Sequence, residues 1–194
     1  MSIMTVRHFT ESDIPARTEL LREAEFQANL TDFAVAAEDA ELAASQLRTI
    51  REEHRTKRMF TICGPRRQVA GFAWITSIDW RAQCCELSFA VLPRYRGGMG
   101  AFAIGAVHDY LRSELNMRVI VNQVLEHNQM MHSARDLAAQ RQVRCDLDSN
   151  TRGKSRTACY WTYTERDEAA WLADASARRR ELADRIVAAR GGQA

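Results

Sequence analysis

Apolar and polar residues alternate with two different periods along the chain, and the period separates predicted strands from predicted helices. Residues 4–9 alternate and predict a first strand. Helical spacing follows over 14–25, where Pro15 is tolerated at an early helical position, and returns over 37–55. The mixed segment 26–36 between them is interpreted as a loop or a broken helix.

Strands dominate the middle of the chain. Three consecutive segments, over 58–64, 68–80 and 84–92, are rich in β-branched and aromatic residues and predict strands. Gly64 and Pro65 impose a turn between the first two segments, which indicates a hairpin. We therefore expect these three strands to pair antiparallel.

The last third of the chain alternates between helices and strands. We predict a helix over 101–115, a strand over 118–126, a helix over 128–139, strands over 142–148 and 156–165 around an SNTRGKS turn, and a final helix over 167–190. Antiparallel strands followed by a β-α-β step predict a mixed sheet in an α/β (α+β) domain.

Length and charge narrow the class of protein. With 194 residues and 46% hydrophobic content, the chain suits one domain, which we place over 1–166. The segment 167–194 is expected to form a helix that packs on this domain or lies at a dimer interface, so both monomer and homodimer remain open. A net charge of +2 provides no basic field for nucleic acid. No apolar run approaches the ~20 residues that a membrane helix needs.

Cysteine usage and the N-terminus predict the compartment. The five cysteines are odd in number and form no C-x-x-C pair, which argues against a zinc site and against a disulfide scaffold. The first residues carry charge early and lack the apolar core of a signal peptide. We expect a soluble protein of the reducing cytoplasm that binds no metal.

The segment 86–107 carries the clearest chemical signal. A strand runs into an Arg/Gly-rich loop, and the loop opens a helix. Its glycines, Gly97, Gly98 and Gly100, allow backbone N–H groups to turn inward, and the helix directs its positive dipole end to the same point. Arg94 and Arg96 would add charge-assisted hydrogen bonds. The pattern fits a pyrophosphate cradle, and an ordinary Gly-rich turn with two solvated arginines is the alternative.

Two other phosphate-binding loops fit this segment poorly. A P-loop requires Lys-Ser/Thr after its glycines, where this chain has Ala101-Phe102. A dinucleotide-binding fingerprint belongs beside the first strand of a βαβ unit, whereas this loop follows three predicted antiparallel strands.

The loop resembles the central motif of the GNAT superfamily, R/Q-x-x-G-x-G/A, in the wording VLPRYRGGMGA. Counted from Arg96, the fourth position is Met99 instead of Gly, and the sixth is Ala101, which the motif allows. The similarity covers roughly 4–165, because TVRHFTESDIPARTELL resembles the opening strand and helix of the family and NQVLEHNQMMHSARDLA resembles its next motif. The segment YWTYTERDEAAW resembles the branch of ribosomal-protein N-terminal acetyltransferases.

The resemblance implies the GNAT fold, a mixed, mostly antiparallel sheet of six to seven strands flanked by helices. It also implies an N-acetyltransferase that moves an acetyl group from acetyl-CoA, or another acyl group from its acyl-CoA, directly to a primary amine. The acceptor would be a small molecule or a protein N-terminus. By the same resemblance, the cofactor-binding residues are Phe89, Ala90, Val91, Leu92, Arg94, Arg96, Gly97, Gly98, Met99, Gly100, Ala101 and Asn128.

Catalytic roles also follow from the resemblance. Glu86 takes the position of the general base, and its alternatives are a half-exposed strand residue or an ion-pair partner of an arginine. An N–H of Phe89, Ala90 or Val91 would stabilise the oxyanion. The family's Tyr acid is replaced by Arg135, which leaves two catalytic candidates on the same helix, Ser133 and His132.

Other readings of the chain remain open. Direct transfer makes Cys84 or Cys85 the weaker choice of nucleophile, because a buried strand cysteine is usually inert. The altered loop position and the missing Tyr favour a non-catalytic module that binds acyl-CoA. The acceptor is expected between 26–36 and 148–156, where the charge of the SNTRGKS turn disfavours a strongly cationic molecule.

Overall fold

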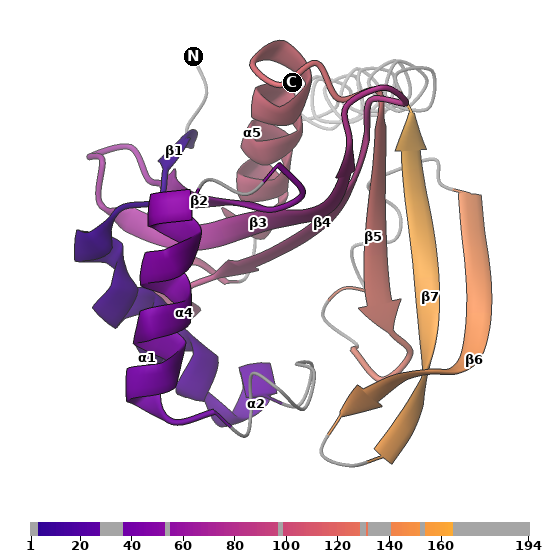
Figure 1. Cartoon of the computed structure of the whole chain (residues 1–194), viewed down its shortest axis with the longest axis horizontal. Helices are drawn as coiled ribbons and strands as arrows, with labels where there is room; N and C mark the ends of the chain where they lie inside the picture. Colours follow the sequence, from indigo (N-terminus) through magenta and orange to yellow (C-terminus); the bar gives the residue numbers. More distant parts are fainter. Residues whose placement is uncertain are drawn as a thin grey trace, which may run out of the picture.

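One seven-stranded sheet organises the chain in the computed structural model (Figure 1). The structure describes residues 4–27, 37–52, 55–96, 99–128, 131, 141–151 and 154–164. The strands lie in the order β1-β2-β3-β4-β5-β7-β6. Their bounds are Thr5–His8 (β1), Arg58–Cys63 (β2), Val69–Asp79 (β3), Cys84–Val91 (β4), Val119–Leu125 (β5), Arg141–Thr151 (β6) and Lys154–Thr164 (β7).

Strand pairing is antiparallel throughout this sheet except between β4 and β5, which are parallel. Helix α5 (Met99–Ser113) lies between these two strands in the sequence and forms the crossover that parallel pairing requires. The predicted fold, a mixed and mostly antiparallel sheet of six to seven strands, is confirmed.

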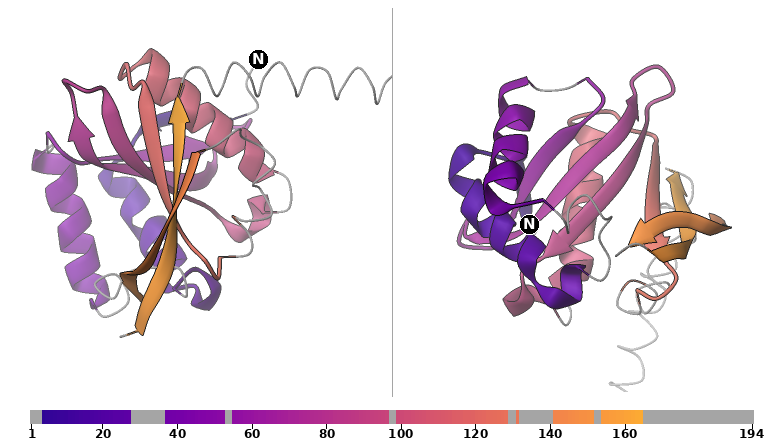
Figure 2. Two further views of the ribbon diagram at one scale, coloured as in Figure 1. Left: turned by 90° about the vertical axis from the view of Figure 1, so that its right-hand side faces the viewer. Right: turned by 60° about the horizontal axis from the view of Figure 1, so that its bottom comes forward.

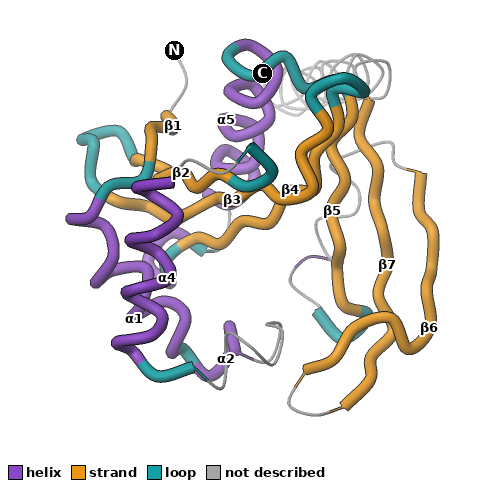
Figure 3. Tube along the Cα trace, in the orientation of Figure 1, coloured by secondary structure: helices purple, strands orange, loops and turns teal. Residues whose placement is uncertain are grey.

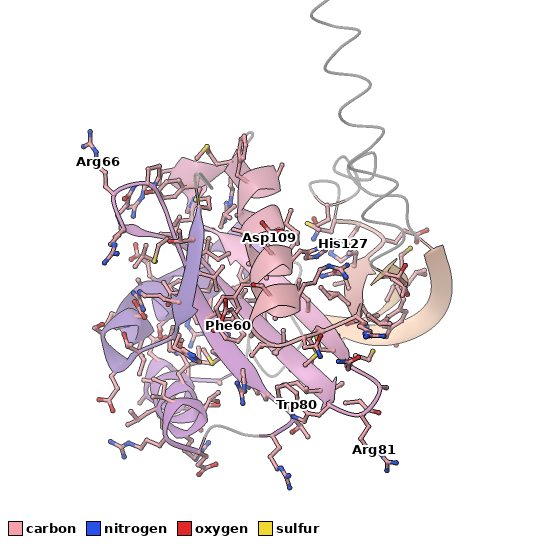
Figure 4. All side chains as sticks on the ribbon, turned by 90° about the horizontal axis from the view of Figure 1, so that it is seen from above. Phe60, Arg66, Trp80, Arg81, Asp109 and His127 are labelled. Atoms are coloured by element: carbon pink, nitrogen blue, oxygen red, sulfur yellow. The ribbon has the colours of Figure 1, made fainter. Side chains whose placement is uncertain are left out.

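Helices cover both faces of the sheet formed by β1 to β4 (Figure 1, Figure 2). Helix α5 packs on one face, where Ala103, Val107 and Leu111 join the main hydrophobic core; Figure 4 labels Phe60 beneath this helix. Helices α1 (Ile14–Arg22) and α4 (Asp39–Glu52) cover the other face. The period of two along β3 separates the faces, because Phe72 packs on the α1 side and Ala73 on the α5 side.

The N-terminus of α1 is fixed by Asp13, which is the last residue of a short 3-10 turn, Glu11–Asp13. Arg7 donates two hydrogen bonds of 2.7 Å to the Asp13 carboxylate, and Thr61 Oγ1 and the Thr10 N–H each donate one of 2.9 Å. Burial raises the pKa of Asp13, but these donors outweigh it and bring the pKa down to about 2. This network ties β1 and β2 to the first helix.

Several element boundaries differ from the sequence prediction, and at two of them the kind of structure changes. The helix expected over 14–25 ends at Arg22, because Glu23 adopts an extended ψ of 128°, and a short helix α2 (Ala24–Gln27) follows. The SNTRGKS turn is mostly strand, since Thr151 still pairs with Lys154 in the β6–β7 hairpin. The final helix over 167–190 and most of the helix over 128–139 lie outside the described residues.

Candidate functional site

Strands β4 and β5 separate partway along their length. They pair over only three residue pairs, from Cys84 with Val119 to Glu86 with Val121. Beyond that point β4 continues beside β3, and β5 continues beside β7. The two strands diverge visibly in Figure 1 and Figure 3. We call the region between 87–91 of β4 and 122–125 of β5, with Leu92 directly after β4, the strand split.

Backbone groups of β4 face the strand split at every second residue. The Leu92 N–H donates to the Ala70 carbonyl at 2.9 Å, so the polar groups of Leu92 and, two residues earlier, Ala90 point to β3. The groups of Phe89 and Val91 therefore point to the split. The Val91 carbonyl accepts from Arg96 Nε at 3.3 Å. Of the three predicted oxyanion donors, the amides of Phe89 and Val91 therefore face the split, whereas the amide of Ala90 does not. The amides of Ala90 and Leu92 point to β3 instead.

Asn122 lies where the two strands separate, and the sequence alone did not predict a role for it. Its Nδ2 donates to the Leu87 carbonyl at 2.6 Å, which is the β4 acceptor that loses its partner strand there. The side chain is 3% exposed, and its Oδ1 is buried without a hydrogen-bond partner. The available signal was the Asn-Gln pair within the otherwise apolar strand VIVNQVL. Asn122 thus replaces a missing backbone donor with a side-chain amide.

Glu86 lies at the base of the strand split. Its carboxylate Oε2 accepts from Thr76 Oγ1 at 3.4 Å, and the side chain is half-buried. Glu86 and Thr76 are cross-strand neighbours, on the face that α1 and α4 cover. Within the described part of the chain no arginine forms an ion pair with Glu86, so the alternative role as an ion-pair partner finds no support there.

The Arg/Gly-rich loop connects the end of β4 to α5. A short 3-10 turn, Pro93–Tyr95, precedes Arg96, and α5 begins at Met99, two residues earlier than predicted. Arg94 Nη2 donates to the Val69 carbonyl at 2.9 Å, and Arg96 forms an ion pair with Glu23 at the α1–α2 junction. Both arginines therefore already have protein partners.

The helix start offers open backbone around the predicted phosphate position. A Cβ added at Gly100 would meet no atom within 4 Å, so the first turn of α5 is uncrowded there. With Met99 and Ala101, this turn presents N–H groups that have no partner within the helix. Gly97 and Gly98 lie outside the described residues.

Of the helix predicted over 128–139, the structure describes Asn128 and Met131, and Met131 is helical. Asn128 Oδ1 accepts the N–H of Met131 at 3.2 Å, which is the hydrogen bond of an N-terminal cap. His132, Ser133 and Arg135 lie outside the described residues, so the structure does not place the two candidate acids.

The strand cysteines are poor nucleophiles in this environment. Cys85 is 1% exposed, and burial, followed by the nearby Cys84 and Glu86, raises the pKa of its thiol to about 12. Burial also raises the pKa of Cys84. A protonated thiol attacks a thioester poorly, which agrees with direct transfer. No cluster of His, Cys, Asp or Glu suited to a metal ion occurs among the residues described.

A sheet whose parallel central pair splits beside a carboxylate, with a helix N-terminus at the end of β4, defines an acyl-transfer fold. The profile of the acetyltransferase (GNAT) domain matches residues 4–135. The chain belongs to this family, and the prediction of an acetyl-CoA-dependent N-acetyltransferase is confirmed at the level of the family. No curated protein sequence matches the chain.

Solved acetyltransferases share the fold at low sequence identity. Spermidine N-acetyltransferase of Vibrio cholerae, in complex with CoA and spermine, is 15% identical, with 89% of this chain and 99% of that chain covered and a TM-score of 0.73. A ribosomal alpha-N-protein acetyltransferase in complex with CoA is 15% identical, with 84% and 95% covered and a TM-score of 0.70. At these identities the likeness establishes the fold alone.

No helix in the described ranges is both long enough and apolar enough to cross a membrane.

Proposed function

We propose that the chain transfers an acetyl group from acetyl-CoA directly to a primary amine, carried by a small molecule or by a protein N-terminus. The observation that supports this most is the strand split, because it leaves the amides of Phe89 and Val91 without a partner strand, three and five residues beyond Glu86 along β4. Acyl transfer to an amine needs both hydrogen-bond donors and a proton acceptor, and β4 supplies both along the split.

Each residue has a proposed task. Acetyl-CoA supplies the activated acyl group as a thioester. Glu86 accepts the proton that the amine must lose, since an ammonium ion is not nucleophilic. The N–H of Phe89 or Val91 donates to the negative charge that develops on the carbonyl oxygen. The proton that the CoA thiolate takes up is assigned to Ser133 or His132, and both assignments stay predictions.

The cofactor would lie along the strand split. The Val91 amide and the Phe89 carbonyl would pair with the pantetheine amides as an added strand, and Asn128 would contact the same arm. The first turn of α5, with Gly97 and Gly98 before it, would hold the pyrophosphate. Arg94 and Arg96 have protein partners in this structure, so we assign them the support of the loop as well as the predicted phosphate contact.

Two measurements test the proposal. Calorimetric titration with acetyl-CoA reports binding, and release of the CoA thiol across an amine panel reports transfer. Glu86→Gln should lower kcat by about 10²- to 10⁴-fold without weakening acetyl-CoA binding, because only the proton acceptor is lost. The matched control is Asp109→Asn on the exposed side of α5 (Figure 4), which should leave both unchanged.

The results separate the proposed enzyme from the alternative. Binding of acetyl-CoA without thiol release for any amine would favour a non-catalytic acyl-CoA module, as do Met99 in the motif and Arg135 in place of Tyr. A Glu86→Gln variant as active as the wild type would remove Glu86 from the mechanism. The cytoplasmic location, the domain division at residue 166 and the monomer or homodimer state stay predictions.

A further inference from the structure

Arg17 occupies a position that an apolar residue would ordinarily fill. It shares the sheet-facing side of α1 with Ile14 and Leu20, which lie three residues before and after it and pack in the core on this face. Its guanidinium carbon lies 5.0 Å from the ring centroid of Trp74 on β3. The side chain is half-buried. A cation therefore projects from the core-facing stripe of the helix onto an aromatic ring.

Among the residues that the structure describes, no carboxylate compensates this cation. Arg17 Nε is fully enclosed without a hydrogen-bond partner, and no salt bridge or hydrogen bond of the described residues involves Arg17. Removal from water lowers the pKa of Arg17 to about 10, and no neighbouring acid raises it again. A partly buried charge without a counter-ion is costly, and an anion that binds to it recovers part of that cost.

A second cation lies close to Arg17. Burial lowers the pKa of Lys57, which precedes β2, and the charge of Arg17 lowers it further, so both charges act in one region. Arg22 of α1 pairs with Asp39, whereas Arg58, the first residue of β2, also has an enclosed Nε without a hydrogen-bond partner and lies 5.1 Å from the Trp80 ring centroid. Arg58 is paired with Ile75, so its side chain lies on the face that α5 covers and not beside Arg17.

The register of the sheet places these cations on the acceptor side of Glu86. Trp74 is paired with Ser88, and Thr76 is paired with Glu86, so all four side chains share the face that α1 covers. Glu86 is the diagonal cross-strand neighbour of Trp74, and such pairs lie roughly 7–8 Å apart. The opposite face carries α5. An acceptor whose amine reaches Glu86 from the α1 side would thus extend over Trp74 toward Arg17.

We propose that Arg17, stacked on Trp74 and supported by Lys57, binds an anionic group of the acceptor, a carboxylate or a phosphate. The acceptor then carries its acidic group far enough from its amine to reach past Trp74, roughly 7–8 Å or more. This inference rests on the proposed acetyl transfer at Glu86. The planar guanidinium suits both anions, because its paired N–H groups match two oxygens of either group. A polyamine would bring further positive charge against two uncompensated cations and is disfavoured.

Matched pairs of acceptors test the proposal in the full-length protein. ω-Amino acids of increasing chain length are compared with their carboxamides, and ω-aminoalkyl phosphates with the corresponding amino alcohols, in calorimetric binding to the CoA-saturated protein and in thiol release. We expect the acid of at least one pair to bind about 10- to 100-fold more tightly than its neutral analogue. The two kinds of pair separate a carboxylate from a phosphate.

Variants locate the preference. Arg17→Met keeps an unbranched apolar stem and should abolish the difference between acid and neutral analogue while leaving acetyl-CoA affinity unchanged. Lys57→Met should reduce the same difference and serves as a second variant if Arg17→Met folds poorly. The control is Arg66→Met in the exposed β2–β3 turn, where Figure 4 shows the side chain directed away from the molecule.

The outcomes distinguish the two proposals. Thiol release that is equally fast for acids and neutral analogues leaves the acetyltransferase standing and overturns the anion site. If no amine releases thiol, the proposed function fails, and the binding data still decide the anion site. Equal affinity for both members of every pair, or a preference that persists in Arg17→Met, overturns it.

Discussion

Asp13→Asn gives the strongest test of how the sheet is joined to α1. The carboxylate is 2% exposed and accepts hydrogen bonds from Arg7, Thr10 and Thr61. Its pKa falls from 3.8 to about 2 in the folded protein, which corresponds to about 2 kcal/mol of stability. Asparagine keeps one oxygen but directs an NH₂ group at these donors. We expect the free energy of unfolding to drop by about 2–3 kcal/mol at pH 7.

The pH dependence of that loss identifies its cause. Because the folded pKa is depressed, the contribution of the ionised Asp13 is fully present above pH 3.8 and is lost as pH falls through about 2. Urea unfolding of wild type and variant should therefore give a constant difference from pH 7 to pH 5 that shrinks between pH 4 and pH 2. A difference that does not change with pH would refute the electrostatic reasoning.

Glu11→Gln is the matched control for this experiment. Glu11 lies two residues before Asp13 and faces Arg51 at 3.9 Å, with side chains that are 62% and 65% exposed. An ion pair in solvent contributes little, so we expect less than about 0.5 kcal/mol. A loss in Asp13→Asn as small as that in Glu11→Gln would also contradict the proposed network.

Two further variants test the centre of the sheet by urea unfolding. In Gly71→Ala the new Cβ would lie 2.3 Å from the Ala90 carbonyl oxygen, so we expect a loss of about 1–3 kcal/mol, whereas Gly105→Ala has open space and should be neutral or stabilising. Asn122→Ala leaves the Leu87 carbonyl without its donor and should cost about 1–3 kcal/mol; an unchanged stability would show that water replaces the amide.

Local periodicity was sufficient to predict most elements of the fold. The period of two placed β3 within one residue of its observed ends, and the apolar spacing after the glycines placed α5 within two. The ends of α1 and of the β6–β7 hairpin were wrong, because Glu23 adopts an extended ψ and forms an ion pair with Arg96, and because the hairpin pairing continues to Thr151 and Lys154. Resemblance supplied the family and the general position of the site.

The sequence could not supply contacts between distant segments. Asn122 has a role only because Leu87 loses its neighbour where two strands part, and Arg96 meets Glu23 across 73 positions of the chain. Arg17 looked like an ordinary helix cation, since the face that α1 turns to the sheet is set by packing. Alternation alone did not say which amides of β4 serve β3; that required the Leu92 hydrogen bond.

The short contact between β4 and β5 also divides the domain mechanically. Strands β1 to β4 form one group, or leaf, of the sheet and lie between helices. Strands β5, β7 and β6 form the other leaf, which pairs with the first over three residue pairs and through the Asn122 amide. Few ladder bonds therefore resist a change in the angle between the leaves. A molecule inserted between the two groups of strands would meet no β4–β5 pairing beyond Glu86 and Val121.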